Sequence, residues 1–223
     1  MDSLIEQFLR RLDGDLSPLK TGVQWFSSSD ANFDPLTGAL RLSHRPAIGT
    51  DAYACILYPR VDLNVIERYE GIHRARTSRY VDIPPFYKGV LGRLNGAFFF
   101  ETALFGVPSS MAQNPPRLDR SAQHPLDVGT ANEDWRLEYE VDDSRFFFAS
   151  GSHSHTENVG YFLTPDNHVE GYLRGGNEIA QWKTLGAFLA AEIERAKSRY
   201  VEYERVMETA QIEFKSKRNK RSR

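Results

Sequence analysis

Two histidines are the side chains most suited to holding a metal ion. His153 and His155 lie two residues apart in the segment 151–155, which reads Gly-Ser-His-Ser-His, and Glu157 follows. In an extended strand this spacing points both imidazoles to one face, where they could share a zinc ion with a carboxylate. The glycine and serines are typical of a turn, and a third ligand at fixed spacing is missing. We expect an exposed loop with no metal and no cofactor, and a metal-dependent hydrolase is the less favoured alternative.

A second group of candidate residues is acidic and lies between positions 133 and 143. It consists of Glu133, Asp134, Glu138, Glu140, Asp142 and Asp143. Paired carboxylates can perform acid–base catalysis, but adjacent ones point to opposite sides of a strand and suit a turn. One interpretation is a solvated strand face that ends in a hairpin turn. The other, which makes these six residues candidates for partner binding, is an acidic surface that binds a basic protein.

The single cysteine, Cys55, lies between Ala54 and Ile56 in an apolar, strand-like segment. One cysteine excludes an intramolecular disulfide and a zinc site built from several thiolates. Free cysteines are usually buried, so we expect a structural thiol. A catalytic Cys–His pair is the alternative.

Charge is distributed unevenly along the chain. The net charge is −2, and the last nine residues, Lys215 to Arg223, contribute +6, which leaves −8 on the remainder. An acidic body attracts a basic partner and raises its association rate. The basic end could contact nucleic acid or an anionic membrane, but it lacks interleaved aromatic residues. We expect a solvated, disordered tail and no nucleic-acid partner.

Length and composition are those of a folded globular protein. The chain has 223 residues, of which 40% are hydrophobic and 26% charged, so it can bury a sizeable core. The N-terminal segment carries Asp2 and Glu6 and has no unbroken apolar run. It resembles neither a secretory signal nor a membrane span. The expectation is a cytoplasmic protein without a membrane partner.

The first sixty residues predict a small lobe of one helix and a hairpin. Ser3 and Glu6 form a capping-box pattern, and apolar residues then recur at helical spacing up to Gly14. Residues 23–26, 40–42 and 52–58 are apolar, strand-like segments separated by turn formers. We therefore expect an N-terminal lobe over residues 1–60.

The middle of the chain predicts two helices, a strand and a long loop. Residues 62–71 have apolar positions three apart, and a polar basic stretch follows. A second helix is expected to begin after Pro84 and to end at Asn95-Gly96, because proline suits a first helical turn and glycine a helix end. Residues 97–105 are aromatic and β-prone, and 106–132 is rich in loop formers.

The last third predicts an antiparallel meander closed by a long helix. The expected strands are 136–141, 145–149, 161–164 and 169–173, separated by turn signals. Thr184 is placed to cap a helix whose apolar residues recur at spacings of four and three as far as Ala210. The fold class is therefore α+β: a twisted antiparallel sheet of about five to six strands with helices packed on it, a long C-terminal helix and the small N-terminal lobe.

The order of these segments resembles the SUKH superfamily, the Smi/Knr-type immunity proteins, over roughly residues 62–200. The family motif is carried by Pro84, Tyr87, Leu91, Asn95, Gly96, Phe105 and Gly106. The resemblance implies a SUKH-like domain over 61–212, followed by the basic tail over 213–223. The chain departs from the family pattern by a basic insertion before Ile83 and by its additional N-terminal residues.

The resemblance implies a protein that binds rather than catalyses. Family members neutralise a cognate polymorphic toxin, often a nuclease or a deaminase, by stoichiometric binding in the cytosol. Exposed aromatic residues in the loops around Phe86 and Trp135 are candidate anchors for such a partner, although core packing is the favoured use of each. A regulatory or scaffold role as a protein-interaction module is the alternative function.

Overall fold

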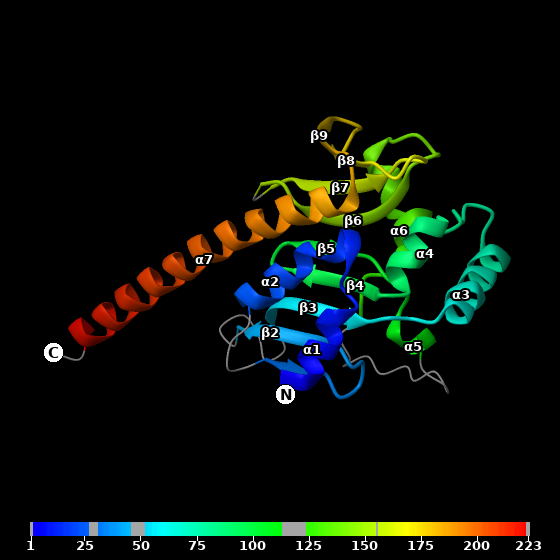
Figure 1. Cartoon of the computed structure of the whole chain (residues 1–223). Helices are drawn as coiled ribbons and strands as arrows, with labels where there is room; N and C mark the ends of the chain where they lie inside the picture. The colour runs from blue at the N-terminus through cyan, green and yellow to red at the C-terminus, as the bar shows by residue number, and fades with distance from the viewer. Residues whose placement is uncertain (1, 27–30, 46–51, 113–123, 155, 222–223) are drawn as a thin grey trace.

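The polypeptide forms one antiparallel sheet with helices on it, as the computed structural model shows for residues 2–26, 31–45, 52–112, 124–154 and 156–221 (Figure 1). Within these residues the sheet has nine strands, and their order in the sheet is their order along the chain. The strands are β1 Asn32–Phe33, β2 Leu40–His44, β3 Tyr53–Pro59, β4 Leu94–Phe99, β5 Thr102–Leu104, β6 Phe146–Ser152, β7 Asn158–Leu163, β8 Val169–Leu173 and β9 Glu178–Trp182. The α+β class is confirmed, with more strands than the five to six expected.

The helices fill the two long connections of the sheet and both ends of the chain. They are α1 Asp2–Arg10, η1 Gly14–Leu16, α2 Pro18–Phe26, α3 Leu63–Arg76, α4 Pro85–Leu91, α5 Ser109–Ala112, α6 Val128–Glu133, η2 Trp135–Tyr139 and α7 Leu185–Arg221, where η marks a 3-10 helix. The segment between β3 and β4 holds α3 and α4. The segment between β5 and β6 holds α5, α6 and η2.

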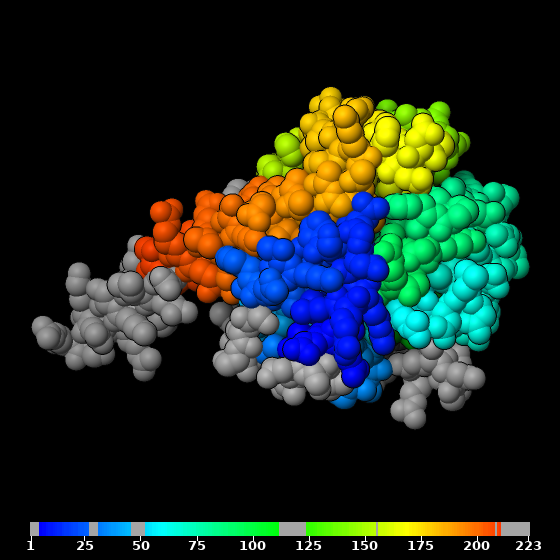
Figure 2. Space-filling model, viewed as in Figure 1, coloured from blue at the N-terminus to red at the C-terminus, as the bar shows by residue number. Residues whose placement is uncertain are grey.

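One face of the sheet is covered by α2 and by the first turns of α7. Leu19, Val23 and Phe26 of α2 and Phe188 and Ile193 of α7 are all buried in the main core. In the space-filling view the blue N-terminal segment lies between orange α7 and the cyan-to-green α3 and α4 (Figure 2). The second half of α7 then extends away from the sheet (Figure 1).

The predicted start of the long helix is confirmed in detail. Thr184 Oγ1 accepts a hydrogen bond of 3.1 Å from the backbone N–H of Ala187, which satisfies one of the free donors of the first turn. At the other end, the sequence predicts a disordered tail over 213–223. The helix instead continues to Arg221.

In the N-terminal segment, residues 23–26 are helical rather than extended. They form the last turn of α2, in which Leu19, Val23 and Phe26 are buried at spacings of four and three. A four-residue apolar run has no period of its own, so the spacing from Leu19 decides in favour of a helix. The strands of this segment belong to the one sheet, since β3 pairs with β4 through Cys55 and Phe99.

The Asn-Gly pair does not end a helix. α4 ends at Leu91, where the backbone N–H of Gly92 donates to Lys88, and Asn95 and Gly96 lie inside β4. Gly96 has φ +85°, and a Cβ there would come within 2.8 Å of the Leu104 carbonyl oxygen. Glycine is therefore required by the close approach of two strands.

The Asn95 side chain connects β4 to the chain beyond β5. Its Nδ2 donates to the Val107 carbonyl at 2.7 Å, and its Oδ1 accepts from the Val107 N–H at 2.8 Å. Residues 97–105 contribute to two strands, β4 and β5, rather than to one, and the turn between the strands contains Phe100 with φ +56°. β5 ends at Leu104, Phe105 is buried beyond it, and Gly106 forms a single parallel bridge with Asp127.

The strand expected over 136–141 is also wrong, because residues 135–139 form the 3-10 helix η2. Arg136 and Tyr139 are buried, whereas Trp135 and Leu137 are exposed. Side chains three apart share one face of a 3-10 helix, so the buried pair fits this geometry. Apolar side chains at 135, 137 and 139 imitate strand alternation. The sequence pattern gives no sign that Arg136 is buried.

Candidate functional site

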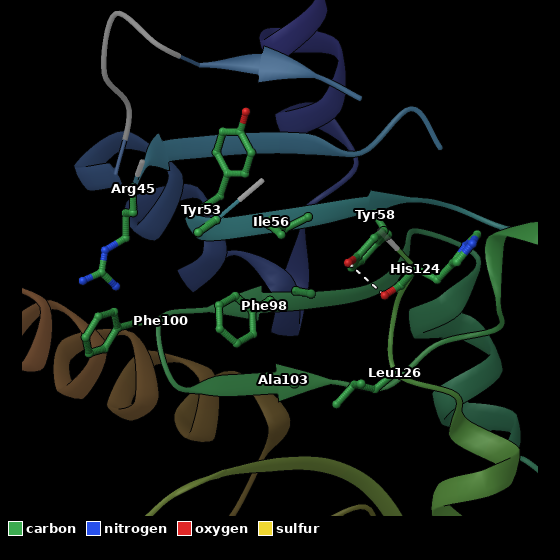
Figure 3. Close-up of a pocket in the computed structure, with 11 residues that line it drawn as sticks. Arg45, Tyr53, Ile56, Tyr58, Phe98, Phe100, Ala103, His124 and Leu126 are labelled. Carbon is green, nitrogen blue, oxygen red and sulfur yellow. Dashed lines mark hydrogen bonds between the residues drawn. The ribbon is translucent and has the colours of Figure 1, made fainter. Parts of the chain in front are cut away.

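The outer face of strands β3 to β5, opposite the helices, is hollowed rather than filled. Ile56, Tyr58 and Ala39 form a small cluster separate from the main core, and Phe98 packs against it. A cavity of about 510 Å³ lies over Ile56, Tyr58 and Phe98 (Figure 3). A second cavity of about 450 Å³ adjoins it and shares Phe98, Ala103 and Leu126 with it. This face therefore carries one extended hollow, with η2 at its border.

Large apolar side chains are exposed at that border, where Leu126 and Trp135 line the second cavity, and on η2 beside it. Leu126 is 43% exposed, Trp135 37% and Leu137 60%. Trp135 is supported by an edge-to-face contact with Phe105, with ring centroids 5.9 Å apart. Beside them the Glu138 carboxylate pairs with Arg174 at 2.7 Å. We call Leu126, Trp135, Leu137 and Glu138 the η2 surface.

The η2 surface has the composition of a protein interface. It combines exposed aromatic and aliphatic side chains with charged ones beside them, and interfaces in which a few anchors supply most of the binding energy have this composition. The 3-10 helix is braced by its buried Arg136 and Tyr139, and it holds the backbone of Trp135, Leu137 and Glu138 in a defined position. Preorganised anchors lose less conformational entropy on binding.

Five of the six acidic candidates lie on or beside this surface. Asp134, Glu138 and Glu140 are exposed along η2 and its ends. Asp142 accepts a hydrogen bond of 2.8 Å from the Ser144 N–H in the turn before β6. The hydrogen bonds from Ser144 lower the pKa of Asp142. Asp143 is fully exposed, 3.4 Å from the Arg136 guanidinium.

Glu133, the sixth acid, is elsewhere: it is buried, with 5% of its surface exposed. Its carboxylate binds His73 Nδ1 with one oxygen and the Arg76 guanidinium with the other. Burial alone raises the pKa of Glu133, but the hydrogen bonds from His73 and Arg76 outweigh it and hold the pKa below its usual range. Glu133 therefore cannot belong to an exposed binding surface.

A second buried pair continues this network. The Tyr69 hydroxyl bonds to the Asp127 carboxylate and accepts from the Gly129 N–H at 2.6 Å. Burial and the neighbouring Asp127 raise the pKa of Tyr69. The pair and the His73–Glu133 pair both join α3 to α6, and the sequence pattern gives no sign of either because the partners lie about sixty residues apart.

A histidine next to a glutamate and a tyrosine next to an aspartate could act in acid–base catalysis. Here the space that a substrate would need is occupied. A Cβ on Gly129 would collide with the Tyr69 hydroxyl and with the His73 ring, and His73 is only 5% exposed. The network therefore serves to fix α6, and with it the start of η2, on α3.

The candidate metal-binding histidines are not part of the acidic group on and beside η2. His153 is exposed in the turn after β6, and its backbone N–H donates to the Glu157 carbonyl at 2.8 Å. His155 falls outside the described residues. Within those residues, no group of three or more His, Cys, Asp or Glu is placed to hold a metal ion.

Two further expectations concern single side chains. Cys55 is confirmed as buried, and burial raises the pKa of its thiol to about 12. Such a thiol is a poor nucleophile at neutral pH. Phe86 is half-buried against the core rather than free to anchor a partner. Trp135 remains the candidate anchor, and Leu126 and Leu137 join it.

The fold and the surface define an α+β protein with an open, partly apolar sheet face. No known family model matches the chain, and neither curated proteins nor solved structures give a match. Across the part of the chain that the structure describes, no helix is both long enough and apolar enough to span a membrane.

Proposed function

We propose that this protein is an immunity protein of the antitoxin type, which neutralises a cognate bacterial toxin by stoichiometric binding through the η2 surface. The observation that carries the proposal is the exposure of Trp135 and Leu137 on the braced helix η2, with Leu126 and Trp135 at the edge of a hollow. A contiguous exposed apolar patch on a folded protein marks an interaction site. The resemblance to the SUKH superfamily, which rests on the sequence motif, supplies the class of partner.

The charge distribution favours a basic partner such as a nuclease or a deaminase. The chain without its last nine residues has a net charge of −8, and exposed acids at 134, 138, 140, 142 and 143 lie on or beside the η2 surface. Complementary charge steers encounter, and the apolar anchors then slow dissociation. Such a complex covers the basic, nucleic-acid-binding face of the toxin.

Co-expression tests this function. The protein is produced together with the product of each gene adjacent to its own, and growth of the host is compared with and without it. We expect one product to be toxic alone, to be tolerated in the presence of this protein, and to purify with it as a complex of fixed stoichiometry. A stable complex without any growth rescue would instead indicate a regulatory or scaffold module.

A further inference from the structure

The second half of α7 extends away from the body of the protein. In the first half, Ile193 and Ala196 are buried in the main core. Tyr203 still reaches the body, where its ring centroid lies 3.7 Å from the guanidinium carbon of Arg45. The helix then continues to Arg221 (Figure 1). A helical segment of about 15 residues is only marginally stable in water without tertiary packing, so a packing partner would stabilise this half.

An apolar stripe runs along this half of the helix. Met207, Ala210 and Phe214 stand three and four positions apart, and Val206 adjoins Met207. Residues at these spacings share one face of an α-helix. Val206 is 55% exposed, Ala210 is exposed and Met207 is half-buried. We call these four residues the α7 stripe, and their spacing is that of the seam between two helices of a coiled coil.

Charge along the same half is separated into two blocks. Residues 201–213 contain four glutamates and one arginine, a net charge of −3, whereas residues 214–223 contain six basic residues and no acidic one, a net charge of +6. A parallel pair of these helices would place the two basic blocks side by side. An antiparallel pair instead places each basic block beside the acidic block of the other helix. The helix dipoles also oppose each other in that orientation.

We propose that this protein forms a two-fold symmetric dimer, in which the second halves of two α7 helices pack antiparallel through the α7 stripe. A two-fold interface uses the same patch of both copies, so one stripe with its two charge blocks is sufficient to form it. The interface contains no residue of the η2 surface. The dimer therefore does not depend on the proposed toxin binding.

Sedimentation equilibrium of the full chain tests the proposal. We expect a reversible equilibrium between monomer and dimer across the micromolar range. The dimer Kd should rise at least about threefold from about 50 to about 500 mM NaCl, because salt screens the attraction between the acidic and basic blocks. A parallel pair would show the opposite sign, since salt would relieve the repulsion between its basic blocks.

Two valines of α7 provide a matched pair of variants. Val206 and Val201 are 55% and 58% exposed, but 3.6 residues per turn place Val201 on the side of the helix opposite the α7 stripe. Val206→Lys should raise the dimer Kd at least about tenfold, because each copy loses a buried valine and gains a positive charge near the partner's basic block. Val201→Lys should leave the Kd within about twofold of the wild-type value. Circular dichroism confirms that both variants fold.

A wild-type chain that stays monomeric at every concentration would overturn the proposal, and so would a dimer Kd that falls with added salt. Equal effects of Val206→Lys and Val201→Lys would exclude the α7 stripe as the interface. If either variant fails to fold, the sign of the salt dependence of the wild-type chain still decides the outcome.

Discussion

At the scale of single residues, the buried contact between His73 and Glu133 has both side chains less than 10% exposed, and it joins α3 to α6. Glu133 is buried and binds His73 and Arg76. Removal of the Glu133 carboxylate leaves the buried His73 without its partner, which is costly, whereas Arg76 is exposed to solvent. This part of the molecule should therefore respond strongly to small chemical changes.

Glu133→Gln should lower the free energy of unfolding by roughly 2–4 kcal/mol, because the buried His73 loses its charged partner. Urea denaturation measures this change. The matched control is Glu140→Gln, an exposed position, for which we expect a change within about 0.5 kcal/mol. Equal effects of the two substitutions would show that the buried network adds nothing to stability.

The same carboxylate gives a pH dependence of known sign. The pKa of Glu133 is lower in the folded protein than its usual value, so the unfolded chain binds its proton more readily. Its stabilising contribution is complete above the ordinary glutamate pKa of about 4.3 and is lost as the pH falls through the folded pKa. The stability gap between wild type and Glu133→Gln should therefore shrink from about pH 7 to about pH 3. A gap that stays constant or widens would contradict this assignment.

At the scale of elements, one glycine in α6 and one in α3 separate the effect of side-chain packing from the effect of helix propensity. A Cβ on Gly129 of α6 would collide with Tyr69 and His73, whereas one on Gly71 of α3 would meet no atom within 4 Å. Gly129→Ala should destabilise the fold by about 1–3 kcal/mol through overpacking. Gly71→Ala should stabilise it by up to about 1 kcal/mol, since alanine favours a helix. Thermal and urea unfolding of both variants check the opposite signs.

Regular elements with a clear period could be predicted from the sequence. The long helix from Leu185, the strands around residues 145–149, 161–164 and 169–173 and the α+β class all follow from spacing and turn signals. η2 could not be predicted, because Trp135, Leu137 and Tyr139 imitate strand alternation. β9 was missed, although Ile179 and Trp182 after a glycine turn gave a weak signal.

The candidate site was predictable only in part. Exposed acids at 134–143 and the anchor Trp135 could be inferred from composition, because their side chains act locally. The burial of Glu133 depends on His73, about sixty residues away, and Arg45 acquires its surroundings from Phe100 and Tyr203. Contacts between residues that are far apart in the chain produce no periodic pattern in a single sequence. For the same reason, the sequence predicts that Asn95 ends a helix and does not reveal its hydrogen bonds with the backbone of Val107.

At the scale of the whole molecule, the charge of the chain is separated into an acidic body and a basic end. The acidic body should accelerate association with a basic toxin by long-range attraction, which salt screens. We expect the association rate constant to fall roughly tenfold from about 50 to about 500 mM NaCl, with a smaller change in the dissociation rate. Stopped-flow measurement of intrinsic tryptophan fluorescence gives both rates. An association rate independent of salt would remove electrostatic steering from the mechanism.

The central claim is that the η2 surface binds and neutralises a toxin, and titration of the toxin's activity tests it most directly. Leu137→Asp changes an exposed leucine of the surface, and Leu63→Asp changes an equally exposed leucine at the start of α3, 60% and 57% exposed respectively. Wild type and Leu63→Asp should abolish the activity at one equivalent, whereas Leu137→Asp should require at least about a hundredfold excess. Full inhibition by Leu137→Asp at one equivalent, or its loss with Leu63→Asp alone, would contradict the account.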